Sequence, residues 1–210
     1  MKKVIYFENI YSIPSKEGIL QRLGYHQKLT QLTQINRQMI DEGIQMGLSL
    51  CHNKGAYLRS PITHRSQSHI EYLEQSLQSS SLSKLLSKCS EVVLMAVTVG
   101  TEITERISKE IAEGDVTLGV IMDATASQAA DAILDWMMDF LNNSLIKEGK
   151  RLTKHRYSPG YGDLPLENQK QIFELMNLHK IGLTLTDTYI LIPEKSVLAI
   201  AGIERIDVNE

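Results

Sequence analysis

A short stretch near the middle of the C-terminal half, RYSPGYG, combines residue types suited to holding a small anionic molecule. Arg156 carries a planar fork of donors that can bind a carboxylate through two hydrogen bonds. Pro159 fixes its own φ and pushes Ser158 into an extended conformation, which leaves the Ser158 N–H and C=O outside any helix. Gly160 lets a ligand approach the backbone, and Tyr161 offers an aromatic face and a hydroxyl. These residues predict a site for a molecule with a carboxylate and a flat ring; a surface turn with a solvated arginine is the alternative.

Helices are predicted on both sides of this stretch from apolar residues at helical spacing. The expected helical segments are residues 16–24, 28–50, 101–114, 116–147 and 166–176. We expect the apolar stripe of the second segment to pack into the core, with a docking surface as the alternative; it consists of Leu29, Leu32, Ile35, Met39, Met46 and Leu50. The fourth segment has an alanine-rich face that would allow another element to approach closely.

Strand patterns are interspersed with these helices. Residues 91–99 form a continuous apolar run that predicts a buried strand, and residues 4–7 predict a short one. Residues 56–63 are expected to be extended, with Pro61 indicating an edge strand or a bend. Near the C-terminus, residues 189–192 and 197–200 predict two strands of a β-hairpin. The serine-rich residues 76–83 are expected to be a loop or a helix terminus. Because strands and helices do not alternate regularly, the fold class is predicted to be α+β.

Composition narrows the class of protein. A chain of 210 residues is expected to form one domain. A formal net charge of -3 argues against nucleic acid as a partner, and the longest apolar runs are too short for a membrane span or a signal-peptide core. Cys51 and Cys89 lie far apart and show no zinc-ligand spacing, so we interpret them as packed thiols. Together these features predict a cytoplasmic protein without a metal site.

The run from Arg156 to about Gly202 resembles the activation domain of cobalamin (vitamin B12)-dependent methionine synthase. RYSPGY matches the R-x-x-P-G-Y element of that family, and LENQKQIFELMN, IGLTLT and IPEKSVLAIAG follow at similar spacing. Upstream, AVTVGTEITERISKEIAEGDVTLGVIMDATASQAADA is similar to stand-alone members. The resemblance implies a single α+β domain over residues 1–210, with a mixed or antiparallel sheet and surrounding helices. Its N-terminal helical part would span about 1–90 and its S-adenosylmethionine-binding core about 91–203.

The same resemblance implies a role for each residue of the loop. The R-x-x-P-G-Y loop of the family binds S-adenosylmethionine, so Arg156 would hold the methionine carboxylate and the backbone of Ser158 would contact the ligand. Tyr161 would lie near the adenosyl group or the facing corrin, and Pro159 and Gly160 complete the set of cofactor-binding residues. The resemblance implies no catalytic acid, base or nucleophile in this chain.

The implied function is that of a stand-alone activation module. It would bind S-adenosylmethionine and support reductive methylation of cob(II)alamin held by a partner, a cobalamin-dependent methionine synthase lacking its own activation domain, with electrons from a flavodoxin-like donor. The cobalamin-binding motif D-x-H-x-x-G has only a mimic here, with Asn177 in place of its aspartate. Because asparagine orients an imidazole poorly, we interpret His179 as a surface or capping residue and expect cobalamin in trans.

Three alternatives remain open at the level of sequence. The chain could reactivate another corrinoid methyltransferase, since the same domain could serve a different client. It could be an S-adenosylmethionine-dependent methyltransferase with a different substrate, although Val97–Gly100 provides one glycine where that fold needs a glycine-rich turn. It could also be a scaffold that has lost the ligand.

Overall fold

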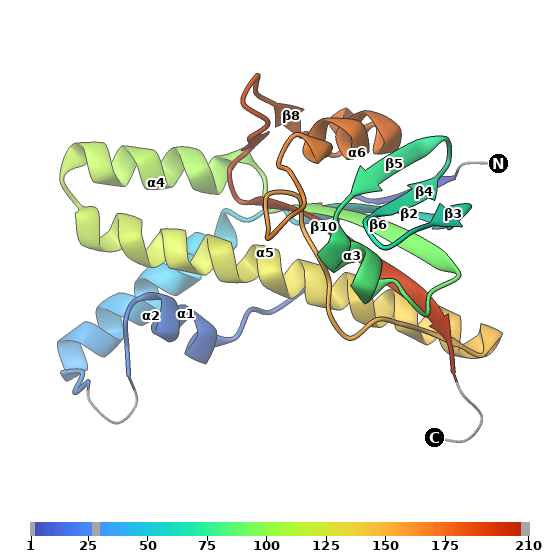
Figure 1. The fold of residues 1–210 in the computed structure, drawn as a ribbon. Helices are drawn as coiled ribbons and strands as arrows, with labels where there is room; N and C mark the ends of the chain where they lie inside the picture. Colours follow the sequence, from blue (N-terminus) through green and yellow to red (C-terminus); the bar gives the residue numbers. More distant parts are fainter. Residues whose placement is uncertain (1–2, 27–29, 207–210) are drawn as a thin grey trace.

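The centre of the fold is a five-stranded antiparallel sheet (Figure 1). The computed structural model describes residues 3–26 and 30–206. In spatial order the strands are β1 (Val4–Phe7), β2 (Lys54–Pro61), β6 (Glu91–Thr98), β10 (Ser196–Arg205) and β7 (Lys150–Leu152). The predicted strand at residues 91–99 is confirmed as β6, the central strand, whose β-branched residues are buried on both faces of the sheet. Because each neighbouring pair is antiparallel and helices flank the sheet, the α+β class is confirmed.

One face of the sheet is covered by a long helix, α5 (Val116–Leu145), which packs beside α4 (Thr101–Glu113). The interface between α5 and β10 is lined by alanines, which let the helix approach the strand closely. They are Ala126, Ala129 and Ala130 of α5 and Ala199 and Ala201 of β10. The predicted helices at 101–114 and 116–147 are confirmed. The close packing of α5 on β10 brings the side chains of α5 near this strand.

The opposite face is covered by shorter elements. They are β3 (His64–Arg65), β4 (His69–Tyr72), β5 (Gln75–Gln78), α3 (Ser80–Leu85), α6 (Asn168–Met176), the 3-10 helix η2 (Leu178–Ile181), β8 (Thr184–Leu185) and β9 (Leu191–Ile192). Leu58, Leu94 and Ile200 of the main sheet pack against them, and Tyr72 and Phe173 close the cluster from the other side. The predicted helix at 166–176 is confirmed as α6.

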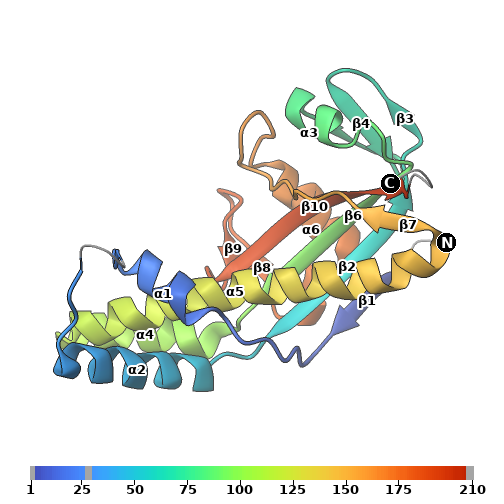
Figure 2. The same ribbon diagram turned by 90° about the horizontal axis from the view of Figure 1, so that it is seen from below.

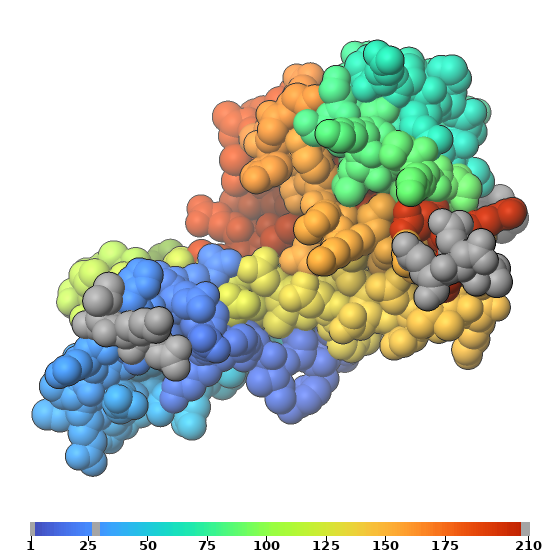
Figure 3. Space-filling model, turned by 60° about the horizontal axis from the view of Figure 1, so that its bottom comes forward, coloured from blue at the N-terminus to red at the C-terminus, as the bar shows by residue number. Residues whose placement is uncertain are grey.

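The first two helices pack on α5 rather than on the sheet. They are α1 (Lys16–Arg22) and α2 (Gln34–Ser49), and with α4 and the start of α5 they extend beyond the sheet (Figure 2). In the space-filling view this helical projection, in blue, stands apart from the region of β3–β5 and α3, with α5 between them (Figure 3). The predicted helix at 16–24 is confirmed, and Ser15 caps it by accepting a hydrogen bond from the Gly18 N–H at 3.2 Å.

The predicted helix at 28–50 begins later than expected. Thr33 has an extended backbone and caps α2 through its hydroxyl, so the helix starts at Gln34; residues 27–29 lie outside the described residues. The expectation of a core stripe is wrong for most of its members. Ile35 is 76% exposed, Met39 and Met46 are also exposed, and the buried face is made by Gly43, Ile44 and Gly47. Two glycines on this face let α2 lie close to α5, which turns the larger apolar side chains outward.

The extended conformation predicted for residues 56–63 is confirmed as β2, but the edge position is wrong, because β2 pairs with β1 on one side and β6 on the other, with Pro61 at its end. The prediction for the C-terminal strands is also wrong. The C-terminal β-hairpin does not form: β9 pairs with β8, and β10 pairs with β6. The other edge of β10 is taken by Tyr157 and β7, which leaves no partner position for β9. The serine-rich segment is a helix terminus in part, since Ser79 caps α3 after the unpredicted β5.

Candidate ligand-binding site

The RYSPGYG loop is attached to the edge of β10. The chain leaves β7 along this edge, where the Thr153 N–H donates to the Gly202 carbonyl at 2.9 Å. Tyr157 then pairs with Ile200 through two backbone hydrogen bonds of 2.8 and 2.7 Å. Because neighbouring side chains of an extended segment point to opposite faces, Arg156 lies on the α5 face and Tyr157 packs against the core of the other face.

Arg156 reaches α5 and pairs with one carboxylate there. Its Nη1 donates to Oδ1 of Asp135, and the Arg156 side chain is 29% exposed whereas that of Asp135 is largely exposed. In the described part of the chain, Nε and Nη2 of Arg156 have no hydrogen-bond partner. Two donors of the guanidinium therefore remain available to a further acceptor, and the aspartate holds the group in place.

The next residues form a tight turn. The Tyr161 N–H donates to the Ser158 carbonyl at 3.1 Å, and the Gly160 N–H donates to the Leu164 carbonyl at 2.8 Å. Gly160 has a φ of +86°, and Pro159 is buried beneath the turn. As predicted, the Ser158 N–H has no partner among the residues described. The prediction that the Ser158 carbonyl is also free is wrong, because it accepts the hydrogen bond from Tyr161. One free backbone donor thus lies two residues from the guanidinium.

Tyr161 is the most solvent-exposed aromatic side chain of the loop. It is 71% exposed and meets the Tyr157 ring edge to face, with centroids 5.7 Å apart. The loop thereby presents a flat aromatic surface to solvent. Arg156, Ser158, Pro159, Gly160 and Tyr161 are brought together by contiguity and by the hydrogen bonds of the turn.

Asp163 anchors the far end of the loop and was missed by the sequence reasoning. Its carboxylate accepts from the Ser79 hydroxyl at 2.5 Å and from the N–H groups of Ser80 and Ser81 at 2.7 and 3.2 Å. These hydrogen bonds, the one from Ser79 foremost, hold the pKa of Asp163 well below its ordinary value. The run of three serines, with free N–H groups at the start of a helix, was the available signal for such a carboxylate.

Asp135 was also missed, although its spacing on α5 carries a signal. Three aspartates of α5 each pair with a cation from another element. The pairs are Asp123 with Lys195 at 2.7 Å, Asp131 with Arg22 at 2.6 Å, and Asp135 with Arg156. Arg156 thus joins α5 in the same way as the cations of two other elements.

The other candidates lie outside this loop. His179 is exposed and meets the Phe173 ring edge to face at 4.7 Å. Cys51 is half-buried and Cys89 is buried, and both are free thiols. Within residues 3–26 and 30–206 no three His, Cys, Asp or Glu side chains are grouped as metal ligands. No helix in the same residues combines the length and apolar character needed to cross a bilayer.

Comparison with known proteins identifies relatives of this fold. A crystal structure of the MetH reactivation domain bound to AdoHcy superimposes with a TM-score of 0.68 at 16% sequence identity, covering 95% of this chain and 78% of that chain. Comparison with curated proteins found no match. A family model, described as the activation domain of vitamin B12 dependent methionine synthase, matches residues 63–204. Since this match spans more than half of the sequence and includes the RYSPGYG loop, the chain belongs to the family of vitamin B12 dependent methionine synthase activation domains.

Proposed function

We propose that the chain binds S-adenosylmethionine at the RYSPGYG loop and activates a cobalamin-dependent methionine synthase that is a separate polypeptide. The observation that carries the proposal is that Arg156 is held by Asp135 through Nη1 and keeps Nε and Nη2 without a partner among the described residues, in the same loop as the exposed ring of Tyr161. Membership of the activation-domain family supports it, as does the similarity to a reactivation domain bound to AdoHcy.

The residues of the loop fit the ligand. S-adenosylmethionine carries a carboxylate, a flat adenine and a positively charged sulfonium. Arg156 would hold the carboxylate through Nε and Nη2, and the free N–H of Ser158 would donate to the same end of the molecule. Gly160 permits close approach to the backbone, and Tyr161 offers its face to the adenosyl group.

The chain's contribution is binding and orientation. When bound, S-adenosylmethionine supplies an electrophilic methyl group, and the protein's residues fix the direction in which that group faces. The hydrogen bonds of the turn and the anchor at Asp163 hold the loop in one shape before a ligand arrives. A rigid loop loses little conformational entropy on binding, which favours a site that must present its ligand to a partner.

We assign cobalamin to the partner because, in the described part of the chain, His179 lacks the surroundings of a cobalt ligand. The position that would need a carboxylate, two residues before His179, is occupied by Asn177, which ends α6 in a left-handed conformation. The imidazole of His179 packs against Phe173 instead of a carboxylate. A histidine that binds cobalt is normally oriented by an anionic neighbour, and no carboxylate among the described residues pairs with His179.

Calorimetry tests the ligand assignment. We expect the wild-type protein to bind S-adenosylmethionine and Arg156→Ala to weaken binding at least fivefold, because a charge-assisted pair to the carboxylate is lost. Lys154→Ala is the matched control: it removes an exposed cation two residues away without touching the fork. Absence of binding by the wild type, with or without a cobalamin-carrying partner, would refute the ligand assignment.

A reconstitution assay tests the client. The protein is added to a methionine synthase that lacks its own activation domain and has been oxidised to cob(II)alamin, with a flavodoxin-like donor and S-adenosylmethionine present. We expect turnover to return, and to fail with Arg156→Ala. A response only from another corrinoid methyltransferase would keep the ligand but replace the client.

A further inference from the structure

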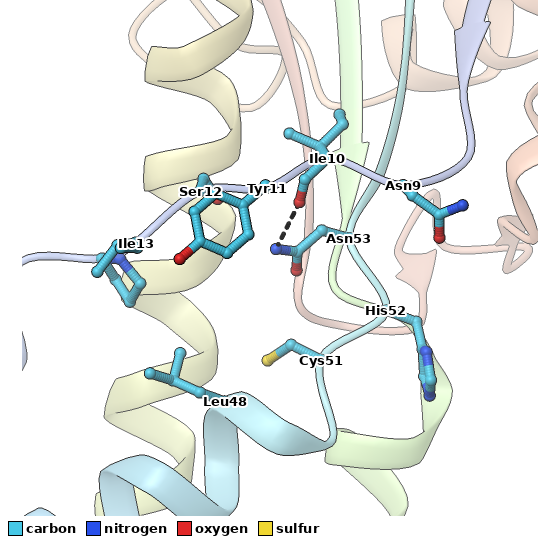
Figure 4. A pocket seen from close by; sticks show the side chains of 10 residues that line it. Asn9, Ile10, Tyr11, Ser12, Ile13, Leu48, Cys51, His52 and Asn53 are labelled. Atoms are coloured by element: carbon cyan, nitrogen blue, oxygen red, sulfur yellow. Dashed lines mark hydrogen bonds between the residues drawn. The ribbon is translucent and has the colours of Figure 1, made fainter.

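A second cavity lies between the N-terminal segment and the end of α2 (Figure 4). Its volume is about 540 Å³, which is in the size range of small-molecule sites. Residues 9–14, which follow β1 without regular structure, form one wall. Leu48 near the end of α2 and residues 51–53, which lead into β2, form the other. The cavity shares no residue with the RYSPGYG loop, so it requires a separate explanation.

The rim of this cavity is apolar and exposed. Tyr11 is 83% exposed and Ile13 is 72% exposed, and they stand opposite Leu48 and Cys51 (Figure 4). Two large apolar side chains left in solvent beside a cavity leave unburied area that a ligand could cover. At about 25 cal/mol per Å² of apolar area, covering both would favour binding by an amount comparable to a good hydrogen bond or more.

Two oxygens of the cavity walls lack a hydrogen-bond partner. Ser12 Oγ and Asn53 Oδ1 are both buried, and neither has a partner among the described residues. Asn53 Nδ2 donates to the Ile10 carbonyl at 3.2 Å, which fixes the amide so that its oxygen is the unpaired atom. In Figure 4 this oxygen points away from Ile10 and toward the side of Cys51. Buried acceptors are normally satisfied, so this pair calls for a donor.

The charged and nucleophilic groups nearby define which ligand fits. His52 Nε2 lies 2.6 Å from Glu102, so the carboxylate at the rim already has a partner. Cys51 donates to the Gly47 carbonyl at 3.3 Å, and burial raises the pKa of its thiol to about 11. The thiol is therefore neutral and weakly nucleophilic near neutral pH. Neither group calls for a charged or covalently bound ligand.

From these contacts we propose that the cavity binds a small, neutral, flat molecule that carries an N–H donor. The ring packs among Tyr11, Ile13 and Leu48, and its N–H donates to Asn53 Oδ1, which the ligand reaches by displacing the cavity-wall atoms that now bury this oxygen. Ser12 Oγ can accept from or donate to a second polar atom of the ligand. Indole and benzofuran are suitable probes because they share one shape, but only indole has the N–H.

Titration of the full-length protein by heteronuclear NMR tests the proposal. We expect indole to shift the resonances of residues 9–14 and 48–53 and to bind at least fivefold more tightly than benzofuran. Bound indole should also slow alkylation of Cys51 by iodoacetamide. Equal affinity for the two probes, or shifts confined to other residues, would overturn the proposal.

Two variants separate binding from folding. Ile13→Ala removes an exposed side chain and should weaken indole binding several-fold. Ser12→Ala should leave the free energy of unfolding unchanged or slightly raised, because the buried Ser12 hydroxyl has no partner among the described residues. Ile35→Ala is the matched control, since Ile35 is equally exposed on α2 but does not line the cavity. If Ile35→Ala weakens binding as much as Ile13→Ala, the cavity is not the site.

Discussion

At the scale of single residues, the shape of the RYSPGYG loop depends on backbone conformations that favour glycine. Gly160 and Gly162 have φ values of +86° and +56°. At Gly162 a Cβ atom would lie 2.2 Å from the Tyr157 hydroxyl, which is closer than any real contact. The loop can therefore fold back over Tyr157 only because this position lacks a side chain.

Replacing Gly162 by alanine should thus destabilise the protein by about 1–3 kcal/mol, the sum of backbone strain and the clash. Urea denaturation measures this loss. Gly149→Ala is the control, because Gly149 has a φ of +68° but open space around its Cβ, so only the strain of about 1 kcal/mol applies. Adding Tyr157→Phe to Gly162→Ala should recover part of the difference. Equal losses for the two single variants would contradict the clash.

The two thiols should be unusually slow to react. Burial raises the pKa of both Cys51 and Cys89 to about 11, so the thiolate fraction at pH 8 is far smaller than for a free cysteine. We expect alkylation by iodoacetamide, followed by intact-mass spectrometry, to be on the order of a hundredfold slower than for a small thiol. The rate should rise about tenfold per pH unit between pH 8 and 10. A rate like that of a free thiol would show that one of them is accessible and ionised.

The loop residues could be predicted from sequence because their chemistry is contiguous. Arg156, Pro159 and Tyr161 lie within six positions, so type and spacing suffice. Their supports could not be predicted in the same way. Asp135 comes from a helix 21 positions earlier, and Ser79 is 84 positions from Asp163, so only the tertiary fold brings them together.

At the scale of elements, a cluster of four charged side chains links three strands and a 3-10 helix that are distant in sequence. Arg59 of β2 contacts Glu91 of β6 and, at 2.7 Å, Glu148 of the 3-10 helix η1 (Ile146–Glu148). Lys150 of β7 contacts Glu91 at 2.8 Å and Glu148 at 3.3 Å. The cluster links the sheet to the end of α5, close to where the chain turns toward the binding loop. Hydrogen bonds from Arg59 foremost lower the pKa of Glu148 to about 2.

This cluster should make stability depend on pH in acid. The pKa of Glu148 in the folded protein lies below its usual 4.5. The stability that Glu148 contributes is therefore complete above pH 4.5 and is lost as the pH falls toward 2. We expect Arg59→Met to lower the free energy of unfolding by on the order of 1–2 kcal/mol at pH 7, and by less at pH 3. Urea titrations at several pH values measure both. Lys109→Met, which breaks an exposed pair with Glu113, should have little effect at either pH. A pH-independent loss for Arg59→Met would contradict the assignment.

Elements were predictable where their signals were local. α4 ends at Gly114, which adopts the left-handed conformation expected of a C-terminal glycine, and β6 is a long apolar run. Pairing was not predictable, because it depends on which strand edges remain free. The short strands β8 and β9 pair with each other only because β10 is occupied on both edges, and two-residue strands carry no periodic signal.

At the scale of the whole molecule, the burial of apolar surface is uneven. The sheet is sandwiched between two large clusters, and β6 is buried along nearly its whole length. In contrast, α2 contributes only a narrow buried face to the helical projection, with Ile44 as its one large buried side chain. The spacing of apolar residues predicted the helix α2 but not its weak packing, since a row of apolar side chains has the same spacing whether it is exposed or buried.

This asymmetry predicts that α2 opens without unfolding of the sheet. The free energy of local opening rises with the apolar area that must be exposed, and α2 covers little of it compared with β6. Native-state hydrogen exchange should show α2 amides exchanging by a sub-global opening, whereas β6 amides exchange only on global unfolding. Ile44→Ala should speed exchange throughout α2 well beyond its effect on β6, and Ile35→Ala, at an exposed position of the same helix, should change neither. Equal protection of α2 and β6 in the wild type would mean that the helical projection and the sheet unfold as one cooperative unit.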